Sequence, residues 1–114
     1  MHHVSEALHQ CVDACASCAH ICLDMAMSTC LEAGGEHIEP KHFRLMIACA
    51  EICRSASAVM LTGVEQHRSV CAACAEICEA CAMSCEQVGG MQECVYACRR
   101  CAKSCRDMSC SDAA

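Results

Sequence analysis

The cysteines of this chain are the feature that most restricts its fold. There are 17 of them in 114 residues, and most recur at every third or fourth position. Residues with that spacing lie on one face of an α-helix, so each run predicts a helix with a stripe of thiols along one side. The three longest runs are Cys11, Cys15, Cys18 and Cys22; Cys71, Cys74, Cys78, Cys81 and Cys85; and Cys94, Cys98, Cys101 and Cys105. A fourth stripe reads His42, Met46, Cys49, Cys53, Ala56 and Met60.

Glycine and proline divide the chain into four such helices. Gly34-Gly35 and Gly89-Gly90 are favourable helix ends, Pro40 suits a first helical turn, and Thr62-Gly63 predicts a tight turn. Short connections make successive helices antiparallel, and the stripes stand where a bundle normally keeps leucine. The sequence therefore predicts an all-α, antiparallel up-down-up-down four-helix bundle with a Cys-lined core. We expect one domain over residues 1–114, with helices at about 4–33, 40–61, 64–88 and 91–108.

Composition and charge exclude several classes of protein. The net charge is −6 and the eight Lys and Arg residues form no block, so no nucleic-acid-binding surface is expected. Charged residues such as Asp13, Glu51 and Glu86 interrupt each apolar stretch, and we therefore expect no transmembrane helix. The first ten residues show no basic and apolar export signal, which predicts a cytoplasmic location where free thiols persist.

A core lined with thiols predicts storage of a soft metal ion. One or two buried cysteines pack as small hydrophobes, but inward stripes of them bury less area than leucine and invite oxidation. A divalent ion held by four thiolates keeps a net charge of about −2, which is costly when repeated in a dry core. Cu(I) paired one-to-one with thiolate leaves no net charge and accepts both Cys and Met sulfur. We therefore expect about one Cu(I) per Cys.

Thioethers and imidazoles at the ends of the stripes are weaker ligands for an entrance. Antiparallel helices group Met25, His42, Met46 and Met91 at the Gly-Gly end, which we expect to be the mouth, and His9, Met60, His67 and Met108 at the other end. Cys30 lies at the margin of its stripe and Cys110 falls off its own. The predicted metal ligands are Cys11, Cys15, Cys18, Cys22, Cys30, Cys49, Cys53, Cys71, Cys74, Cys78, Cys81, Cys85, Cys94, Cys98, Cys101, Cys105, Met25, His42, Met46 and Met91. The terminal Met1-His2-His3 is a weaker pattern for chelating Cu(II) or Ni(II).

The chain resembles the bacterial copper storage proteins over essentially its whole length. The residues that carry the resemblance are the cysteine runs Cys11 to Cys22, Cys71 to Cys85 and Cys94 to Cys105. The resemblance implies a preformed four-helix bundle, Cu(I) storage along its interior and assembly into homotetramers. That family has exported and cytosolic branches, and the high cysteine count with no signal peptide makes the chain similar to the cytosolic branch. The second predicted helix is also apolar on more than one side, at Phe43, Ile47 and Val59 among others, which favours a contact between subunits.

Three other functions remain as alternatives. A metallothionein-like buffer for Zn, Cu or Ag would bind many soft ions but would gain its structure only with metal. An Fe–S protein would focus four cysteines on each cluster, which long parallel stripes do not do. A thiol redox enzyme would carry C-x-x-C at a helix start beside βαβ structure, and that context is missing. No nucleophile–base pair or phosphate loop is evident either, so we expect no enzyme activity.

Overall fold

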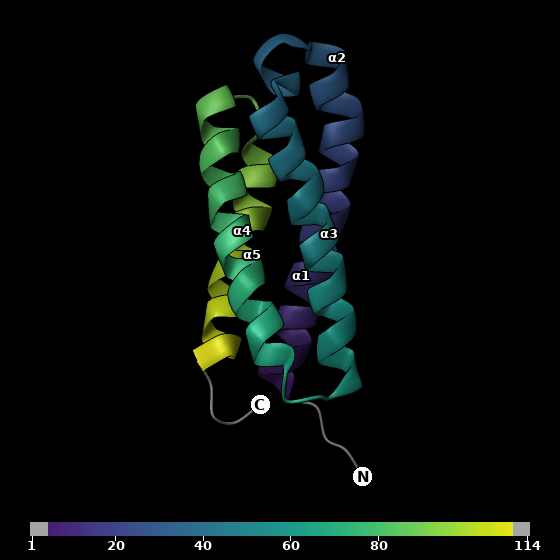
Figure 1. Ribbon diagram of the computed structural model, residues 1–114, viewed down its shortest axis with the longest axis vertical. Helices are drawn as coiled ribbons and strands as arrows, with labels where there is room; N and C mark the ends of the chain where they lie inside the picture. The colour runs from purple at the N-terminus through teal and green to yellow at the C-terminus, as the bar shows by residue number, and fades with distance from the viewer. Residues whose placement is uncertain (1–4, 111–114) are drawn as a thin grey trace.

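Four long helices run antiparallel along a common axis (Figure 1). Each of them carries one of the cysteine stripes. They are α1 (Glu6–Met25), α3 (Pro40–Thr62), α4 (His67–Val88) and α5 (Gln92–Cys110). The computed structural model describes residues 5–110. Its dimensions of 50 × 20 × 19 Å are those of a narrow cylinder whose length is set by the helices. The predicted fold class, an antiparallel four-helix bundle with a Cys-lined core, is confirmed.

Local capping explains where two of these helices begin. The Oγ of Ser5 accepts a hydrogen bond from the backbone N–H of Leu8 at 3.1 Å, at the start of α1. At the start of α3 the carboxylate of Glu39 accepts from the N–H of Lys41 at 3.2 Å, and Pro40 occupies the first turn. These side chains satisfy N–H groups that have no partner within the helix, which typically stabilises a helix by about 1 kcal/mol.

The connection between α3 and α4 is longer than the sequence pattern predicts. Gly63 ends α3 in the left-handed conformation, with φ of 80°, and its N–H bonds the carbonyl of Met60. Residues 64–66 then form a turn, so α4 begins at His67 rather than at Val64. At the opposite end the expected loop at 36–39 contains a short 3₁₀ helix, η2 (Gly35–Ile38).

The first helix continues beyond α1 through a π-helical turn, η1 (Ala26–Cys30), into a last short turn, α2 (Leu31–Ala33). A π turn holds one more residue than an α turn. Met25 and Cys30 are five positions apart, one more than the α-helical stripe allows, and the wider turn absorbs that extra residue. Cys30 is consequently fully buried instead of lying at the margin of the core.

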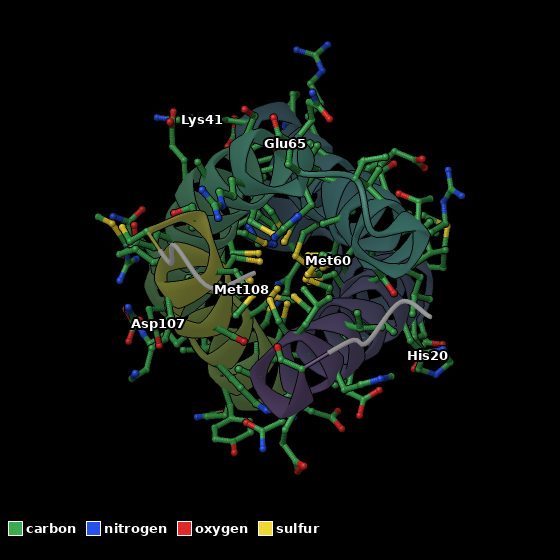
Figure 2. All side chains as sticks on the ribbon, turned by 90° about the horizontal axis from the view of Figure 1, so that it is seen from below. His20, Lys41, Met60, Glu65, Asp107 and Met108 are labelled. Carbon is green, nitrogen blue, oxygen red and sulfur yellow. The ribbon has the colours of Figure 1, made fainter. Side chains whose placement is uncertain are left out.

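The four helices form a square around the axis. α1 packs against α3 and α5, and α4 packs against the same two helices. Seen along the axis, the sulfur atoms gather at the centre while labelled polar side chains such as His20, Lys41 and Asp107 radiate outward (Figure 2). Of the 17 cysteines, 16 are buried and only Cys110 is exposed. The core is therefore built of thiols, alanines and methionines.

Charged residues lie on the outer face of the bundle. Arg99 pairs with Glu86 and Arg106 with Glu79, both between α5 and α4, and all four side chains are about half exposed.

By length and composition alone, the helical segments Glu6–Ala33 and Pro40–Thr62 are apolar enough to cross a membrane, contrary to the expectation that charges interrupt every such stretch. The core helix of a soluble protein passes the same test, and in these two segments 39% and 33% of the apolar stretch is buried inside the bundle.

Candidate metal centre

The buried thiols form one continuous column rather than separate clusters. Five sets of four cysteines have all their Sγ atoms within 4.8 Å of one another. Taken along the axis, each set shares two cysteines with the next, so that a ligand of one set is also a ligand of its neighbour. The sets are Cys15, Cys74, Cys101 and Cys105; Cys53, Cys74, Cys78 and Cys101; Cys18, Cys49, Cys53 and Cys78; Cys18, Cys22, Cys49 and Cys98; and Cys22, Cys81, Cys94 and Cys98.

Each of these sets draws its thiols from three different helices. The shortest contacts join α1 to α5: Cys15 Sγ lies 3.3 Å from Cys105 Sγ, and Cys22 Sγ lies 3.3 Å from Cys94 Sγ. α3 and α4 meet at a similar distance, 3.4 Å, between Cys53 and Cys78. These separations exceed a disulfide bond of about 2.05 Å, and every one of these cysteines is a free thiol. The tertiary fold thus brings thiols from three helices next to one another in the core.

Thiol–thiol hydrogen bonds and burial shift the protonation of the column. The bond with Cys18 raises the pKa of the Cys98 thiol, and burial adds to that effect. The bond with Cys22 moves Cys94 in the other direction and lowers its pKa. Burial is the main cause that raises the pKa of Cys30. Since thiolate is the form that binds metal, a metal ion that binds a thiol with a raised pKa, such as Cys98 or Cys30, must displace its proton.

The column continues into a thioether at the Gly-Gly end, the end formed by Gly34-Gly35 and Gly89-Gly90. The Sδ of Met46 lies 3.4 Å from Cys85 Sγ, 3.6 Å from Cys81 Sγ and 3.8 Å from Cys94 Sγ. Met46 is fully buried, so its sulfur faces three thiols in a dry environment. A softer, neutral ligand therefore stands directly beyond the last four-thiol set.

A mixed group of sulfur and nitrogen ligands lies at the same end. Cys30 Sγ is 3.8 Å from Nε2 of His42 and 4.0 Å from Sδ of Met91. The other imidazole nitrogen of His42 is 2.8 Å from Oγ of Ser84, which orients the ring. Burial lowers the pKa of His42, and the neighbouring His37 lowers it further, so the imidazole is neutral near pH 7. The Ser84 hydroxyl can accept from Nδ1 or donate to it, and in the tautomer with Nδ1 protonated the Nε2 lone pair faces Cys30.

A cleft of about 340 Å³ opens beside this group between α3 and α4. His42 and Ser84 line it, together with Lys41 and the carboxylates of Glu36 and Glu39, which leave its lining with a net negative charge. Acidic groups at a cleft raise the local concentration of cations. His42 lines this cleft and also contacts Cys30, so the cleft lies beside the buried thiols at the Gly-Gly end.

The structure places all of the predicted ligands in the interior of the bundle. All the predicted cysteines are buried, and so are Met25, His42, Met46 and Met91. His9, expected with the ligands of the opposite end, is exposed and lies outside them. Residues 1–3, the weaker Cu(II) or Ni(II) pattern, lie outside the described part of the chain. Ser84 was not predicted, because no spacing rule links a serine on α4 to an imidazole on α3.

A four-helix bundle with a shared column of free thiols defines a class of protein that binds many soft metal ions. The chain belongs to the copper storage protein family, whose sequence profile matches residues 4–110. The resemblance seen in the cysteine runs is therefore confirmed, and with it the assignment of a copper storage protein whose cargo is Cu(I).

Solved structures agree with this assignment. The protein Nmul_A1745 from Nitrosospira multiformis is 54% identical, with a TM-score of 0.91 over 93% of this chain and 97% of that one. The Cu(I)-bound copper storage protein BsCsp3 is 35% identical, with a TM-score of 0.84 over 91% and 99%. Apo Csp3 from Bacillus subtilis is 36% identical, with a TM-score of 0.77 over 89% and 97%. A curated relative, the uncharacterized cysteine-rich protein YhjQ of Bacillus subtilis strain 168, is 37% identical over 77 residues, which is 68% of each chain.

Proposed function

We propose that the chain stores Cu(I) along the whole thiol column, with about one ion per Cys, as a single four-helix domain. The observation that carries this proposal is the sharing of cysteines between successive four-thiol sets. In a filled column one thiolate can bridge two neighbouring ions. Separate tetrahedral sites would each need four ligands that they share with no other site.

Charge favours Cu(I) over a divalent ion in this setting. The column lies in the middle of the bundle, and the side chains of its cysteines have no exposed surface. Each Cu(I) bound by one thiolate adds no net charge, while each Zn²⁺ in a four-thiolate site leaves about −2. We infer that a general soft-metal buffer is the weaker alternative, because several Zn²⁺ sites would accumulate charge in one dry core.

The proposed ligands are the thiols of the column with the softer groups of the Gly-Gly end. They are Cys11, Cys15, Cys18, Cys22, Cys30, Cys49, Cys53, Cys71, Cys74, Cys78, Cys81, Cys85, Cys94, Cys98, Cys101, Cys105, Met25, His42, Met46 and Met91. Cys110 is left out because its side chain is exposed, whereas the thiols of the column are buried.

Anaerobic titration with Cu(I) against a competing chelator, followed by native mass spectrometry, tests the filling of the column. We expect saturation near one ion per buried Cys. Saturation at three or four ions would contradict the proposal. A parallel titration with Zn²⁺ separates the alternative, because a general buffer would fill with either metal to a comparable extent.

Matched alanine variants assign the capacity to the column. The double variant Cys53→Ala/Cys98→Ala removes two thiols that belong to different four-thiol sets. It should lose about two Cu(I), since we expect about one ion per thiol. Cys110→Ala is the control, because it removes an exposed thiol and should keep full capacity.

We propose the Gly-Gly end as the copper entrance. The acidic cleft, the neutral imidazole of His42 and the thioethers of Met46 and Met91 support that role. Replacing Met46 and Met91 by Leu keeps the volume of the core nearly unchanged. We expect slower loading in stopped-flow measurements, with capacity nearly intact. A large loss of capacity at an unchanged rate would point instead to a structural role in the column.

The cellular setting proposed for this chain is the reducing cytoplasm. Its support is chemical: the protein holds 16 buried free thiols, many of them 3.3 to 4.0 Å from a neighbouring sulfur, and the cytosol keeps thiols reduced. We also propose that the protein is not an enzyme and acts by binding and release alone. Immunodetection in fractionated cells would test the location.

We propose that the protein assembles into a homo-oligomer. The family resemblance implies a tetramer. The apolar residues expected at a subunit contact stay outside the core: Ile47 is exposed, and Phe43, Leu45, Ile52 and Val59 are half-buried. Leu23 on the neighbouring α1 is also exposed and lines a shallow hollow with Ile47. Sedimentation velocity should detect the oligomer, and a monomer at micromolar concentration would contradict it.

A further inference from the structure

The end of the bundle opposite the Gly-Gly end carries its own group of soft ligands. It lies at the Thr62-Gly63 turn, and we call it the far end. Met60 is fully buried, Met108 is 5% exposed and His67 is 3% exposed. Viewed from this end, Met60 and Met108 lie beside the axis on opposite sides of the bundle (Figure 2). None of these three residues belongs to the ligand set proposed above.

The imidazole of His67 is held in one tautomer by its backbone. Nδ1 lies 2.8 Å from the carbonyl oxygen of Val64, and a carbonyl oxygen can only accept, so Nδ1 carries the proton. In the neutral ring, Nε2 is therefore left with a lone pair. That atom is buried and has no hydrogen-bond partner among the residues that the structure describes. A buried acceptor without a partner is unfavourable for an apo protein and is what a metal-binding nitrogen needs.

The position of His67 continues the thiol column. His67 is four residues before Cys71, so the two side chains lie on the same face of α4. Cys71 interacts with Cys105, and also with Cys11, and all three thiols have no exposed surface. The imidazole thus stands one helical turn beyond the last thiol of its stripe, with the thioethers of Met60 and Met108 as its buried companions at this end of the core.

We propose that the far end is a further Cu(I) site in which Nε2 of His67 binds the metal together with the thiolate of Cys71. Met60 and Met108 supply thioether sulfur beside it. One thiolate with neutral nitrogen and thioether ligands balances the charge of one Cu(I). The inference rests on the proposed storage function, because it needs the thiol column to carry copper to this end.

A purely structural histidine would behave differently. An imidazole that only fills space at the far end keeps its Nε2 lone pair free whether or not the thiols are loaded. A ligand nitrogen changes its electronic state when the metal arrives. Cu(I) is a closed-shell d¹⁰ ion and diamagnetic, so nuclear magnetic resonance can follow that nitrogen directly.

The first experiment uses the full chain labelled with ¹⁵N at histidine, titrated anaerobically with Cu(I). Two-bond ¹H–¹⁵N correlation spectra resolve the two nitrogens of each ring. We expect the Nε2 resonance of His67 to move from the position of a free lone pair to that of a metal-bound nitrogen, while its Nδ1 resonance stays protonated. An Nε2 resonance that does not move at full loading overturns the proposal.

A pair of leucine variants provides the second experiment. His67→Leu removes the nitrogen while keeping an apolar side chain in the core, and His20→Leu removes an exposed imidazole on α1 as the control. Native mass spectrometry after loading should show one Cu(I) fewer in His67→Leu than in the wild type, and no loss in His20→Leu. Equal capacities of the two variants overturn the proposal.

The ultraviolet absorption of Cu(I)–thiolate bonds distinguishes a failure of the far-end site from a failure of the storage function. If that absorption rises with added Cu(I) while Nε2 of His67 stays unchanged, the far-end site is wrong and the storage column stands. If neither signal appears, the storage function itself is contradicted.

Discussion

Single residues differ sharply in their access to solvent within this protein. Cys110 lies on the last turn of α5 and is exposed, while the other 16 cysteines are buried. The reactivity of a thiol depends on access as much as on its thiolate fraction. The sequence pattern placed Cys110 off its stripe, and the structure agrees with that placement.

The apo protein should therefore contain one fast-reacting thiol. We expect a disulfide reagent such as DTNB to label Cys110 rapidly and the buried thiols slowly, at the rate at which the bundle opens. In Cys110→Ser the fast phase should disappear while the slow phase persists. Several fast phases in the wild type would contradict the burial of the column.

Raised thiol pKa values predict a loss of apo stability in alkali. Burial raises the pKa of Cys30 above its ordinary value of 9.0. A group with a raised folded pKa stabilises the fold below its unfolded pKa, and this stabilisation is lost as the pH rises through the folded pKa. We expect the melting temperature of the reduced apo protein to fall between about pH 8 and about pH 10. Thermal melts should show a smaller fall for Cys30→Ala, and equal falls would exclude Cys30 as a contributor.

At the scale of elements, periodicity predicted the helices but not the π turn. Continuing the α-helical stripe from Met25 leads to residue 28 or 29, so Cys30 stood at its margin. The structure instead widens one turn over Ala26–Cys30 and faces Cys30 toward His42 and Met91. A local pattern with a fixed period cannot anticipate this, because the wider turn is stabilised by contacts with α3 and by the residue just before α5.

The connection after α2 depends on a backbone conformation that only glycine adopts readily. Gly34 has φ of 67° and ψ of −155°, and a Cβ added there would meet nothing within 4 Å. Gly34→Ala should thus destabilise the apo protein through backbone strain alone, by about 1–3 kcal/mol. Chemical denaturation would measure this cost. The exposed Glu36→Ala in the same connection is the control, expected to change stability by less than about 0.5 kcal/mol.

At the scale of the whole molecule, we expect the fold to form without its cargo. The helices bury thiols, alanines and methionines in a closed square, and these contacts need no metal. That separates the protein from a metallothionein-like chain, whose fold depends on its ions.

Far-ultraviolet circular dichroism of the reduced apo protein should therefore show a predominantly helical spectrum. Addition of Cu(I) to saturation should change it little, since the ligands already lie together. A helical signal that appears only on loading would reverse this view and favour the metal-dependent buffer. Chelation of the bound copper should return the apo spectrum without unfolding.

The sequence by itself determined the helices, their inward thiol faces and the kind of metal, because spacing along a helix and the charge of thiolate are local properties. It could not determine which thiols meet, that successive four-thiol sets share members, or that Ser84 orients His42. Nor could it show the unpartnered nitrogen of His67. The thiol sets and the Ser84–His42 contact join residues from different helices, and the burial of His67 also depends on its neighbours in space; only the packing of four helices around one axis decides these features.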